Sequence, residues 1–522
     1  MIFRTFFFLG MLFLSLVTLG QSTVECNLLN LSKLTLDKNP TIKVSNLGVD
    51  RAKANTKIQA STFDFQLASD ASYSQNKLNL FNSDSRSAII NGKLETDNST
   101  FSLELQRKFR SGINANLSLD YSQVSDNFPL NRFNQEVGAN ISDHTVSTTL
   151  SLTQPLLKGR GRKVTTASEK ASVLNLESSE NNFRITNAIE LLQMGNAYWQ
   201  YLSAYKNLKI YRENEQRVLN VLQITKELVQ ADKKPAGDLI QVQADLANQE
   251  RQTKVAEQNL HNTRINLGRS IGLNEIESKN IGNPQDKFPT IFKSNFDDDI
   301  YFEMLKQSAL ANRTDLTAFE KSKEALELQL TAAKNNLKPQ LDLTGFVNYG
   351  GMKMGNGFNN AFNALTNKQG SNYVVGLRLN LLFPLNNSFA KGSYLQSKTA
   401  LSEQEISYND LHRNINLNVN ISFNNLKNSV LILEKANKSL RFHQKVFSNE
   451  QEKFQNGLTT LLNLILYQER LTFAQLDHIR AQQQFAVAIL NLRYETGTLI
   501  SLDSNTITTP SKEVFYEFPN IK

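Results

Sequence analysis

The fold is decided by residues 373–433, which read YVVGLRLNLLFPLNNSFAKGSYLQSKTALSEQEISYNDLHRNINLNVNISFNNLKNSVLIL. Apolar residues occupy every second position from Tyr373 to Leu381, which is the period of a β-strand with one apolar and one polar face. After Pro384 the period becomes helical, with apolar residues three or four positions apart (Leu411, Ile415, Val419, Phe423, Leu426, Val430 and Leu433). A strand therefore leads directly into a helix.

Two such helical runs are unusually long. One extends from about residue 388 to 456, and the other from 163 to about 231 with a single glycine, Gly195, and no proline. Each run has nearly 70 residues, which corresponds to roughly 100 Å of helix. A compact globular domain has little use for helices of this length, so the runs favour a coiled coil or a tubular assembly.

Further segments alternate with period two, at residues 63–73, 101–105, 113–119, 146–152 and 341–349. Strands of about ten residues with one apolar and one polar face are typical of an outer-membrane β-barrel. Half-buried strands of a soluble sheet are the alternative. The neighbouring long helices and a signal for export favour the membrane.

That signal is residues 1–20, which we interpret as a secretory signal peptide. Arg4 supplies the positive charge, residues 6–17 form an apolar run, and Gly20 is a suitable cleavage position. A membrane anchor is the alternative. Cys26 follows Glu25, which does not resemble a lipid-attachment site, and a single cysteine excludes a disulfide framework or a cysteine-based zinc site.

The chain contains an internal repeat. Residues 42–67 align with 316–341, and residues 239–272 align with 464–497 at a constant offset of 225. We expect a first repeat over 21–280, a connecting equatorial segment at 281–312, a second repeat over 313–500 and a tail at 501–522. The first repeat has an insertion of about 45 residues, which contains an extra hairpin at about 95–125.

The repeat also predicts how helices pair. The short helices expected at about 41–61 and 237–272 together match the length of one long helix, and those at 314–336 and 459–497 nearly do. Each repeat can therefore place one long helix beside two short helices laid end to end. This arrangement fits the wall of a cylinder.

In this order, several short segments resemble the TolC-like outer-membrane efflux protein family: 36–40 (LDKNP), 152–159 (LTQPLLKG), 381–385 (LLFPL) and 454–460 (FQNGLTT). The resemblance implies a mixed α and β fold with long antiparallel helical hairpins that form a periplasmic α-barrel. It also implies a homotrimer in which four strands per protomer close a 12-stranded barrel. Independently, four to six strands cannot close a barrel alone, and lipid does not tolerate open edges. The extra hairpin departs from the pattern, and it either enlarges the barrel or extends it outside the membrane.

The resemblance implies that the chain is expected to be an outer-membrane exit duct of a tripartite efflux pump or type I secretion system, with a large periplasmic part. Its partners would be outer-membrane lipid, a periplasmic adaptor and an inner-membrane transporter. A non-conducting periplasmic coiled-coil bridging protein is the alternative.

An enzyme finds no support, because no P-loop, nucleophile elbow or metal-ligand spacing of histidines occurs. The glycine-rich residues 350–357 are expected to be a barrel loop. Without such motifs we expect no cofactor and no metal. We expect no nucleic acid either, because the net charge of +8 is spread thinly over 522 residues.

A passive duct needs a gate, which we expect at the hairpin tips. In the family, acidic rings near the second tip constrict the channel, but the matching positions here are Asn463 and Leu466. The repeat offset pairs Asn463 with Asp238 of the first hairpin. We therefore predict a mixed ring of Asp238, Asn463 and Leu466, while Asp238 can instead be the N-cap of a helix.

The same tips are the expected docking surface for the adaptor, with Lys233, Lys234, Phe454 and Gly457 as candidates. Each has a simpler interpretation. Gly457 can be required only by a turn, Phe454 can pack within its own hairpin, and the two lysines can be merely solvated.

Overall fold

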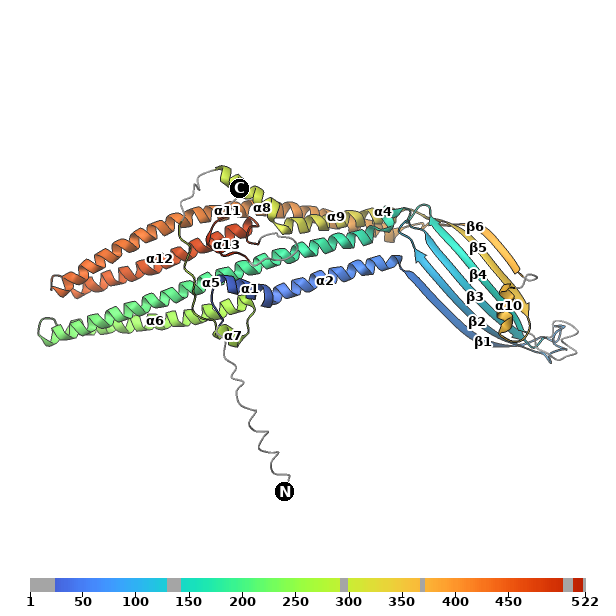
Figure 1. The fold of residues 1–522 in the computed structure, drawn as a ribbon, viewed down its shortest axis with the longest axis horizontal. Coiled ribbons are helices and arrows are strands. Elements are labelled where there is room, and N and C mark those ends of the chain that lie inside the picture. The colour runs from blue at the N-terminus through green and yellow to red at the C-terminus, as the bar shows by residue number, and fades with distance from the viewer. Residues whose placement is uncertain (1–23, 129–141, 292–298, 367–370, 501–509, 520–522) are drawn as a thin grey trace, which may run out of the picture. The chain divides into compact units, whose positions relative to one another are not determined.

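The structure is a computed structural model that describes residues 24–128, 142–291, 299–366, 371–500 and 510–519 (Figure 1). The expected signal peptide at 1–20 lies outside the described residues. Two compact units are present: unit 1 comprises Met1–Val49, Glu180–Ala318 and Tyr408–Lys522, and unit 2 comprises Asp50–Ser179 and Phe319–Ser407. Over the described ranges, no helix combines the length and the apolar character needed to cross a membrane.

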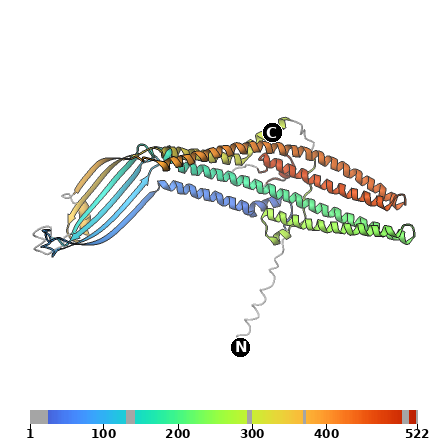
Figure 2. The same ribbon diagram turned by 180° about the vertical axis from the view of Figure 1, so that it is seen from behind.

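Unit 2 is built around one antiparallel sheet. Its six strands lie in sequence order: β1 (Phe65–Asn79), β2 (Lys93–Lys108), β3 (Asn114–Asp126), β4 (Ser142–Pro155), β5 (Gln340–Met354) and β6 (Ser371–Leu382) (Figures 1 and 2). At 12 to 16 residues the strands are longer than the expected ten. The reason is that the pairing with neighbouring strands continues past the apolar positions into polar residues, as at Lys93–Ser99 of β2, which pair with β1 throughout.

The register separates the two faces of this sheet. One row of paired residues crosses all six strands and is entirely apolar: Leu67, Leu105, Leu117, Leu150, Val347 and Val375. A second row, three residues away along each strand and on the opposite face, contains only polar residues and glycine: Asp70, Ser102, Asp120, Ser147, Gly350 and Asn372. Each strand thus contributes to one apolar and one polar face, as the period of two predicts.

A short helix, α10 (Asn359–Thr366), packs on the apolar face. Ala361 and Ala364 of this helix are buried against Val146 of β4. The preceding glycine-rich segment was expected to be a loop, but residues up to Met354 belong to β5. Only 355–358 form the turn before α10, with φ of 141° at Gly355 and 102° at Gly357. A strand can extend through Gly350 and Gly351 because β4 supplies the pairing partners.

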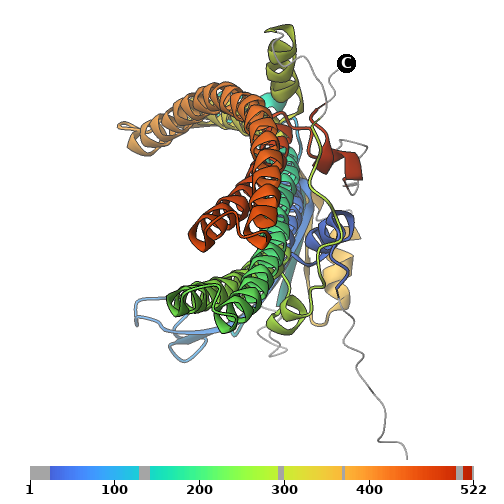
Figure 3. The ribbon, with the colours of Figure 1, turned by 90° about the vertical axis from the view of Figure 1, so that its left-hand side faces the viewer.

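The helices confirm the two long runs: α5 (Ala167–Gln230) has 64 residues and α11 (Ser388–Gln455) has 68. Among the described residues the other helices are α1 (Leu28–Lys38), α2 (Pro40–Ala60), η1 (Ser61–Phe63), α4 (Arg162–Thr165), α6 (Ala236–Ile271), α7 (Glu275–Lys279), α8 (Asp299–Asn312), α9 (Thr314–Asn335), α12 (Leu461–Glu495) and α13 (Lys512–Tyr516). Within unit 1, α5 with α6 and α11 with α12 form two hairpins (Figure 3).

The short helices meet end to end in both repeats, as predicted. At the end of α6, Gly272 adopts a φ of 90°, and a Cβ there would lie 2.8 Å from Pro40 at the start of α2. At the end of α12, Gly497 adopts a φ of 68° and abuts the backbone of Asn312, just before α9. Only glycine fits both requirements, which explains the matched glycine-closed turns.

The core of unit 1 surrounds Trp199, which is fully buried on α5. Gly195 lies one turn earlier, where a Cβ would lie 2.7 Å from a methyl group of Leu490 on α12, so this glycine lets two helices approach closely. Cys26 is 1% exposed in the same core, and burial raises the pKa of its thiol to about 12. The lone cysteine is therefore a packing residue in this structure.

Candidate functional site

The two hairpin tips start their second helices at equivalent positions. α6 begins at Ala236 and α12 at Leu461, which reproduces the offset of 225. Asp238 and Asn463 are consequently the third residues of their helices. Because Pro235 precedes α6 as its N-cap, the alternative that Asp238 is an N-cap is wrong. Its carboxylate instead lies in the first turn, where the helix dipole favours a negative charge.

The predicted gate residues are accessible at the tips. Asp238 is half-buried, Asn463 is exposed and Leu466 is 39% exposed. Among the residues that the structure describes, no hydrogen bond joins Asp238 to Asn463. A single chain thus places these side chains at matching helix positions without bringing them together.

The second tip carries an acidic side chain that the sequence did not indicate as a site. Glu450 of α11 is 7% exposed and accepts a hydrogen bond from the hydroxyl of Thr459 across the turn. That hydroxyl oxygen accepts in turn from Nδ2 of Asn463, at 3.3 Å. The Thr459 hydrogen bond, aided by Lys453 at 3.4 Å, holds the pKa of Glu450 below its usual range. A carboxylate is therefore present two hydrogen bonds away from Asn463.

The four predicted docking residues have different surroundings. Lys233 is exposed, whereas Phe454 is 5% exposed and packs in a cluster with Leu461 and Leu464. The ammonium of Lys234 lies 5.5 Å from the centre of the Phe454 ring, a cation–π contact that joins the first tip to the second. Phe454 thus has the packing role that the sequence left open as an alternative.

The turn of the second tip explains its glycine. Gly457 has a φ of 74°, and no atom would crowd a Cβ at this position. The backbone conformation alone therefore favours glycine here. Sequence reasoning missed the adjacent Leu458 and Leu462, which are 76% and 62% exposed at the tip. The sequence alone gives no signal for their exposure, because it depends on the geometry of the FQNGLTT turn.

A buried polar layer joins the two hairpins behind the tips. Asn214 of α5, which is 2% exposed, donates to Oε1 of Gln249 on α6 at 2.8 Å and accepts from Nε2 of Gln468 on α12 at 3.0 Å. Arg217 reaches Oδ1 of Asn214 at 3.3 Å and the Thr472 hydroxyl at 3.5 Å. Burial lowers the pKa of Arg217. Polar groups buried between helices fix their relative position, because breaking the contacts leaves unsatisfied donors.

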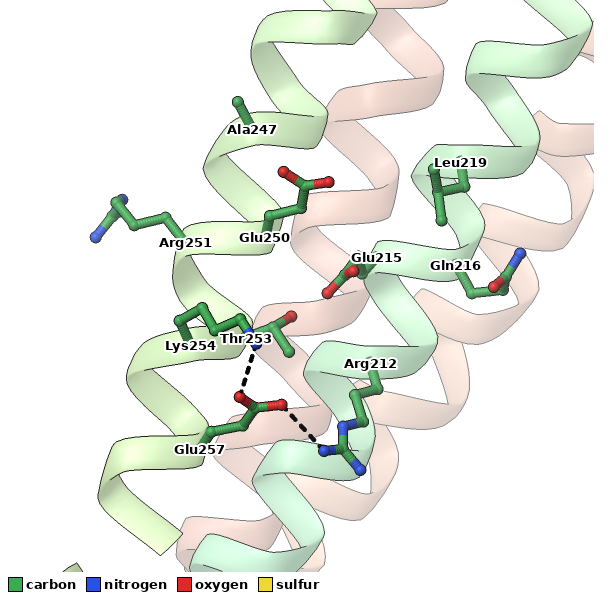
Figure 4. Close-up of a pocket in the computed structure, with 10 residues that line it drawn as sticks. All are labelled: Arg212, Glu215, Gln216, Leu219, Ala247, Glu250, Arg251, Thr253, Lys254 and Glu257. Atoms are coloured by element: carbon green, nitrogen blue, oxygen red, sulfur yellow. Dashed lines mark hydrogen bonds and ion pairs between the residues drawn. The ribbon is translucent and has the colours of Figure 1, made fainter. Parts of the chain in front are cut away.

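The surface of the first hairpin is hollowed between α5 and α6, and this hollow is lined mainly by charged and polar side chains (Figure 4). Glu257 accepts from Arg212 and from Lys254, both at 3.0 Å, and these hydrogen bonds lower the pKa of its carboxyl. The ions are exposed, so the pairs stabilise the hairpin only slightly. Within the described ranges, no group of three or more histidine, cysteine or acidic residues is arranged to hold a metal ion.

Comparison with known proteins shows which families and structures this chain resembles. Residues 305–498 match the family model "Outer membrane efflux protein". No curated protein matches the sequence.

Several solved structures of outer-membrane channels share the fold. The Campylobacter jejuni outer membrane channel CmeC has a TM-score of 0.63 at 16% identity, over 90% of this chain and 86% of the other. The Vibrio cholerae outer membrane protein VceC has a TM-score of 0.63 at 14% identity, over 90% and 96%. The open Neisseria gonorrhoeae MtrE outer membrane channel has a TM-score of 0.59 at 14% identity, over 90% and 88%. The chain is thus similar to the TolC-like outer membrane efflux proteins, by sequence over residues 305–498 and by fold over 90% of its length.

Proposed function

We propose that this chain is an outer-membrane exit duct that passively conducts substrates across the periplasm and the outer membrane, in an efflux pump or a type I secretion system. One observation carries the proposal: a row of apolar side chains crosses all six strands on one face of the sheet. Leu67, Leu150 and Val375 of this row are 69%, 47% and 68% exposed in the single chain. Apolar exposure on this scale is a liability in water and an advantage in lipid.

Two free edges of the sheet support the proposal that several copies assemble. β1 and β6 have partners on one side only, so each leaves a row of backbone donors and acceptors unpaired. Lipid supplies no partner for these groups, and six strands are too few to close on themselves. Homotrimer formation pairs the edges of neighbouring copies and creates a barrel shared between protomers.

The hairpin tips are the proposed gate and the proposed docking surface. In a trimer, three copies of Asp238, Asn463 and Leu466 would surround the axis at the narrow end. The polar layer around Asn214 would hold the two hairpins of each copy together while the tips are closed. A periplasmic adaptor would contact the exposed Lys233 and the turn at Gly457, and Phe454 would support this surface from beneath.

Energy for transport would come from an inner-membrane transporter, since no nucleotide site is evident in the sequence. The alternative of a non-conducting bridging protein gives no reason for the exposed apolar face. Its strands would form a soluble cap, and a charge on either face of the sheet would then be tolerated.

A matched pair of substitutions on β4 tests the membrane assignment. Leu150→Arg places a charge on the apolar face and should cost about 2–4 kcal/mol of insertion free energy if the residue lies near the bilayer midplane. Ser151→Arg is the control, because its side chain lies on the polar face of the same strand. The measurement is the yield of heat-modifiable oligomer in the outer-membrane fraction. Equal yields for both variants would contradict the proposal.

A further inference from the structure

The inserted hairpin of the first repeat is fully integrated into the sheet. β2 pairs with β1 over the whole length of β1, and β3 pairs with β4 along twelve residues from Asn114 to Ser125. The hairpin therefore separates β1 from β4, which would otherwise be neighbours. If the hairpin projected beyond the sheet, β1 and β4 would pair with each other. In the structure, β1 and β4 are not paired.

The apolar positions of the hairpin lie level with those of its neighbours. Leu105 pairs with Leu67 of β1, and Leu117 pairs with Leu150 of β4. Phe101 and Tyr121 are opposite each other at the end of this stretch, where α10 covers Tyr121 and the neighbouring Val146 of β4. The apolar stretch of the hairpin thus coincides with the stretch that the proposed function places in lipid.

Beyond the aromatic pair the same face becomes polar. Ser99 pairs with Gln123, and Asp97 pairs with Ser125. Glu95 of β2 forms an ion pair with Lys77 of β1 at 2.9 Å. The change from apolar to polar along each strand is what a membrane boundary requires, and it occurs within the hairpin as it does in β1.

The other face of the hairpin is polar except at Leu94 and Val124, near the end of the sheet far from Phe65. Glu104 accepts a hydrogen bond from Nδ2 of Asn116 at 2.7 Å, and Asp120 accepts from the Ser118 hydroxyl at 2.9 Å. Gln106 donates to Oε1 of Gln66 on β1 at 2.9 Å. These side chains suit a water-filled lumen and not a second layer of protein.

We propose that the β2–β3 hairpin widens the transmembrane wall, so that three six-stranded sheets close an 18-stranded barrel in place of a 12-stranded one. The inference rests on the proposed function, which supplies the membrane and the three copies. The occupant of each free edge is a second copy of this chain: β6 of one copy pairs with β1 of the next. Since barrel diameter grows roughly in proportion to strand number, the lumen is about 1.5 times wider than with four strands per copy.

The two edges are compatible with this pairing. β1 leads away from the helix that precedes it and β6 leads into the helix that follows it, so the two edges are antiparallel to each other, like every other neighbouring pair in the sheet. Both edges carry their apolar side chains on the same face. Aligning the aromatic residues that end each apolar stretch, Tyr73 and Tyr373, places Ala71 opposite Val375.

Arginine substitutions on β3 test whether the hairpin lies in lipid. Leu117→Arg should lower the yield of inserted oligomer about tenfold or more, and Asn116→Arg, on the polar face of the same strand, should leave it near that of the wild type. If both are tolerated while Leu150→Arg on β4 still blocks insertion, the hairpin lies outside the membrane and the inference fails. If Leu150→Arg is also tolerated, the proposed function itself fails.

Deleting residues 93–127 tests the width, because it leaves β1 and β4 free to pair and keeps their antiparallel direction. The barrel diameter in projection images of the trimer in nanodiscs should fall by about one third relative to the wild type. Equal diameters for the deletion variant and the wild type would overturn the inference but would leave the proposed function unaffected. If the deletion variant does not fold, the wild-type diameter alone decides between 12 and 18 strands.

Cysteine pairs test the proposed edge. Ala71→Cys combined with Val375→Cys, or with Tyr373→Cys or Leu377→Cys to allow for register, should give a covalent trimer on oxidation. Ala71→Cys with Phe101→Cys is the control, because these residues pair within one copy and should give a monomer. Absence of any intermolecular product from all three combinations would contradict pairing between copies.

Discussion

The two hairpin tips share a repeat but are stabilised by different contacts. At the second tip, Thr460 caps α12 with its side chain and Thr459 bonds to Glu450 across the turn. At the first tip, Pro235 offers no side-chain cap, and the turn between α5 and α6 is closed mainly by backbone hydrogen bonds such as Lys233 N to Leu228 O at 2.9 Å. The difference suggests that the second tip is the firmer anchor and that the first tip is easier to displace.

The largest effect should come from the contact that joins the tips. Phe454→Ala removes a 5% exposed ring from its cluster and also the cation–π contact with Lys234. Truncation of a buried phenylalanine costs about 3–5 kcal/mol. Hydrogen exchange should accelerate at both tips.

Leu458→Ala is the control for this substitution, since Leu458 is 76% exposed in the same turn. Acceleration confined to the second tip would show that the two tips are independent. It would remove the basis for describing Phe454 as their link.

A smaller effect is expected from the hydrogen bond across the second turn. Thr459→Val keeps the side-chain shape but leaves the largely buried Glu450 without its hydroxyl donor. Loss of a hydrogen bond to a charged group costs about 1.5–3 kcal/mol. Amides around residues 450–463 should exchange faster, and those around residues 228–240 should not. Faster exchange at both sites would contradict the asymmetry.

Substitutions at the two helix caps can weaken the second tip and strengthen the first. Thr460→Ala should destabilise the second tip by about 1 kcal/mol, because the side chain accepts from the amide of Asn463. Pro235→Ser should supply the equivalent acceptor for the amide of Asp238 and stabilise the first tip. Local unfolding free energies from hydrogen exchange would measure both changes. A first tip left unchanged by the serine would mean that capping does not explain the difference.

The smallest expected effect is a pH dependence at the second tip. The folded pKa of Glu450 lies below its ordinary value, chiefly because of the Thr459 hydroxyl. A lowered folded pKa contributes stability that is complete above the ordinary glutamate pKa and is lost as the pH falls through the folded pKa. The tip should therefore loosen on strong acidification, and Thr459→Val should reduce this dependence. NMR titration of the Glu450 carboxyl would reveal an unshifted pKa if the contact is absent in solution.

Much of the fold was predictable because it follows from chain-long patterns. The absence of proline predicted α5 and α11, and the offset of 225 predicted that α6 and α12 start at matching positions. The N-cap interpretation of Asp238 was wrong because it followed from the preceding Gly237 and overlooked Pro235, which ends the turn.

Contacts between distant side chains were not predictable. Lys234 meets Phe454 across 220 positions, and Glu450 meets Thr459 only because Gly457 turns the chain. The position of the inserted hairpin relative to its neighbouring strands was not predictable either. Alternation shows which residues share a face of a strand, but not the register of that strand with its neighbours.

Single-channel conductance of the purified mature protein in planar bilayers tests the central claim most directly. We expect a small unitary conductance that rises in Asp238→Ala or Asn463→Ala, because both substitutions act at the proposed constriction. Lys254→Ala, which lies in the exposed groove of Figure 4, is the control and should conduct like the wild type. If neither tip substitution changes the conductance, the constriction lies elsewhere in the duct. A well-folded, membrane-inserted oligomer that conducts no current would contradict the account.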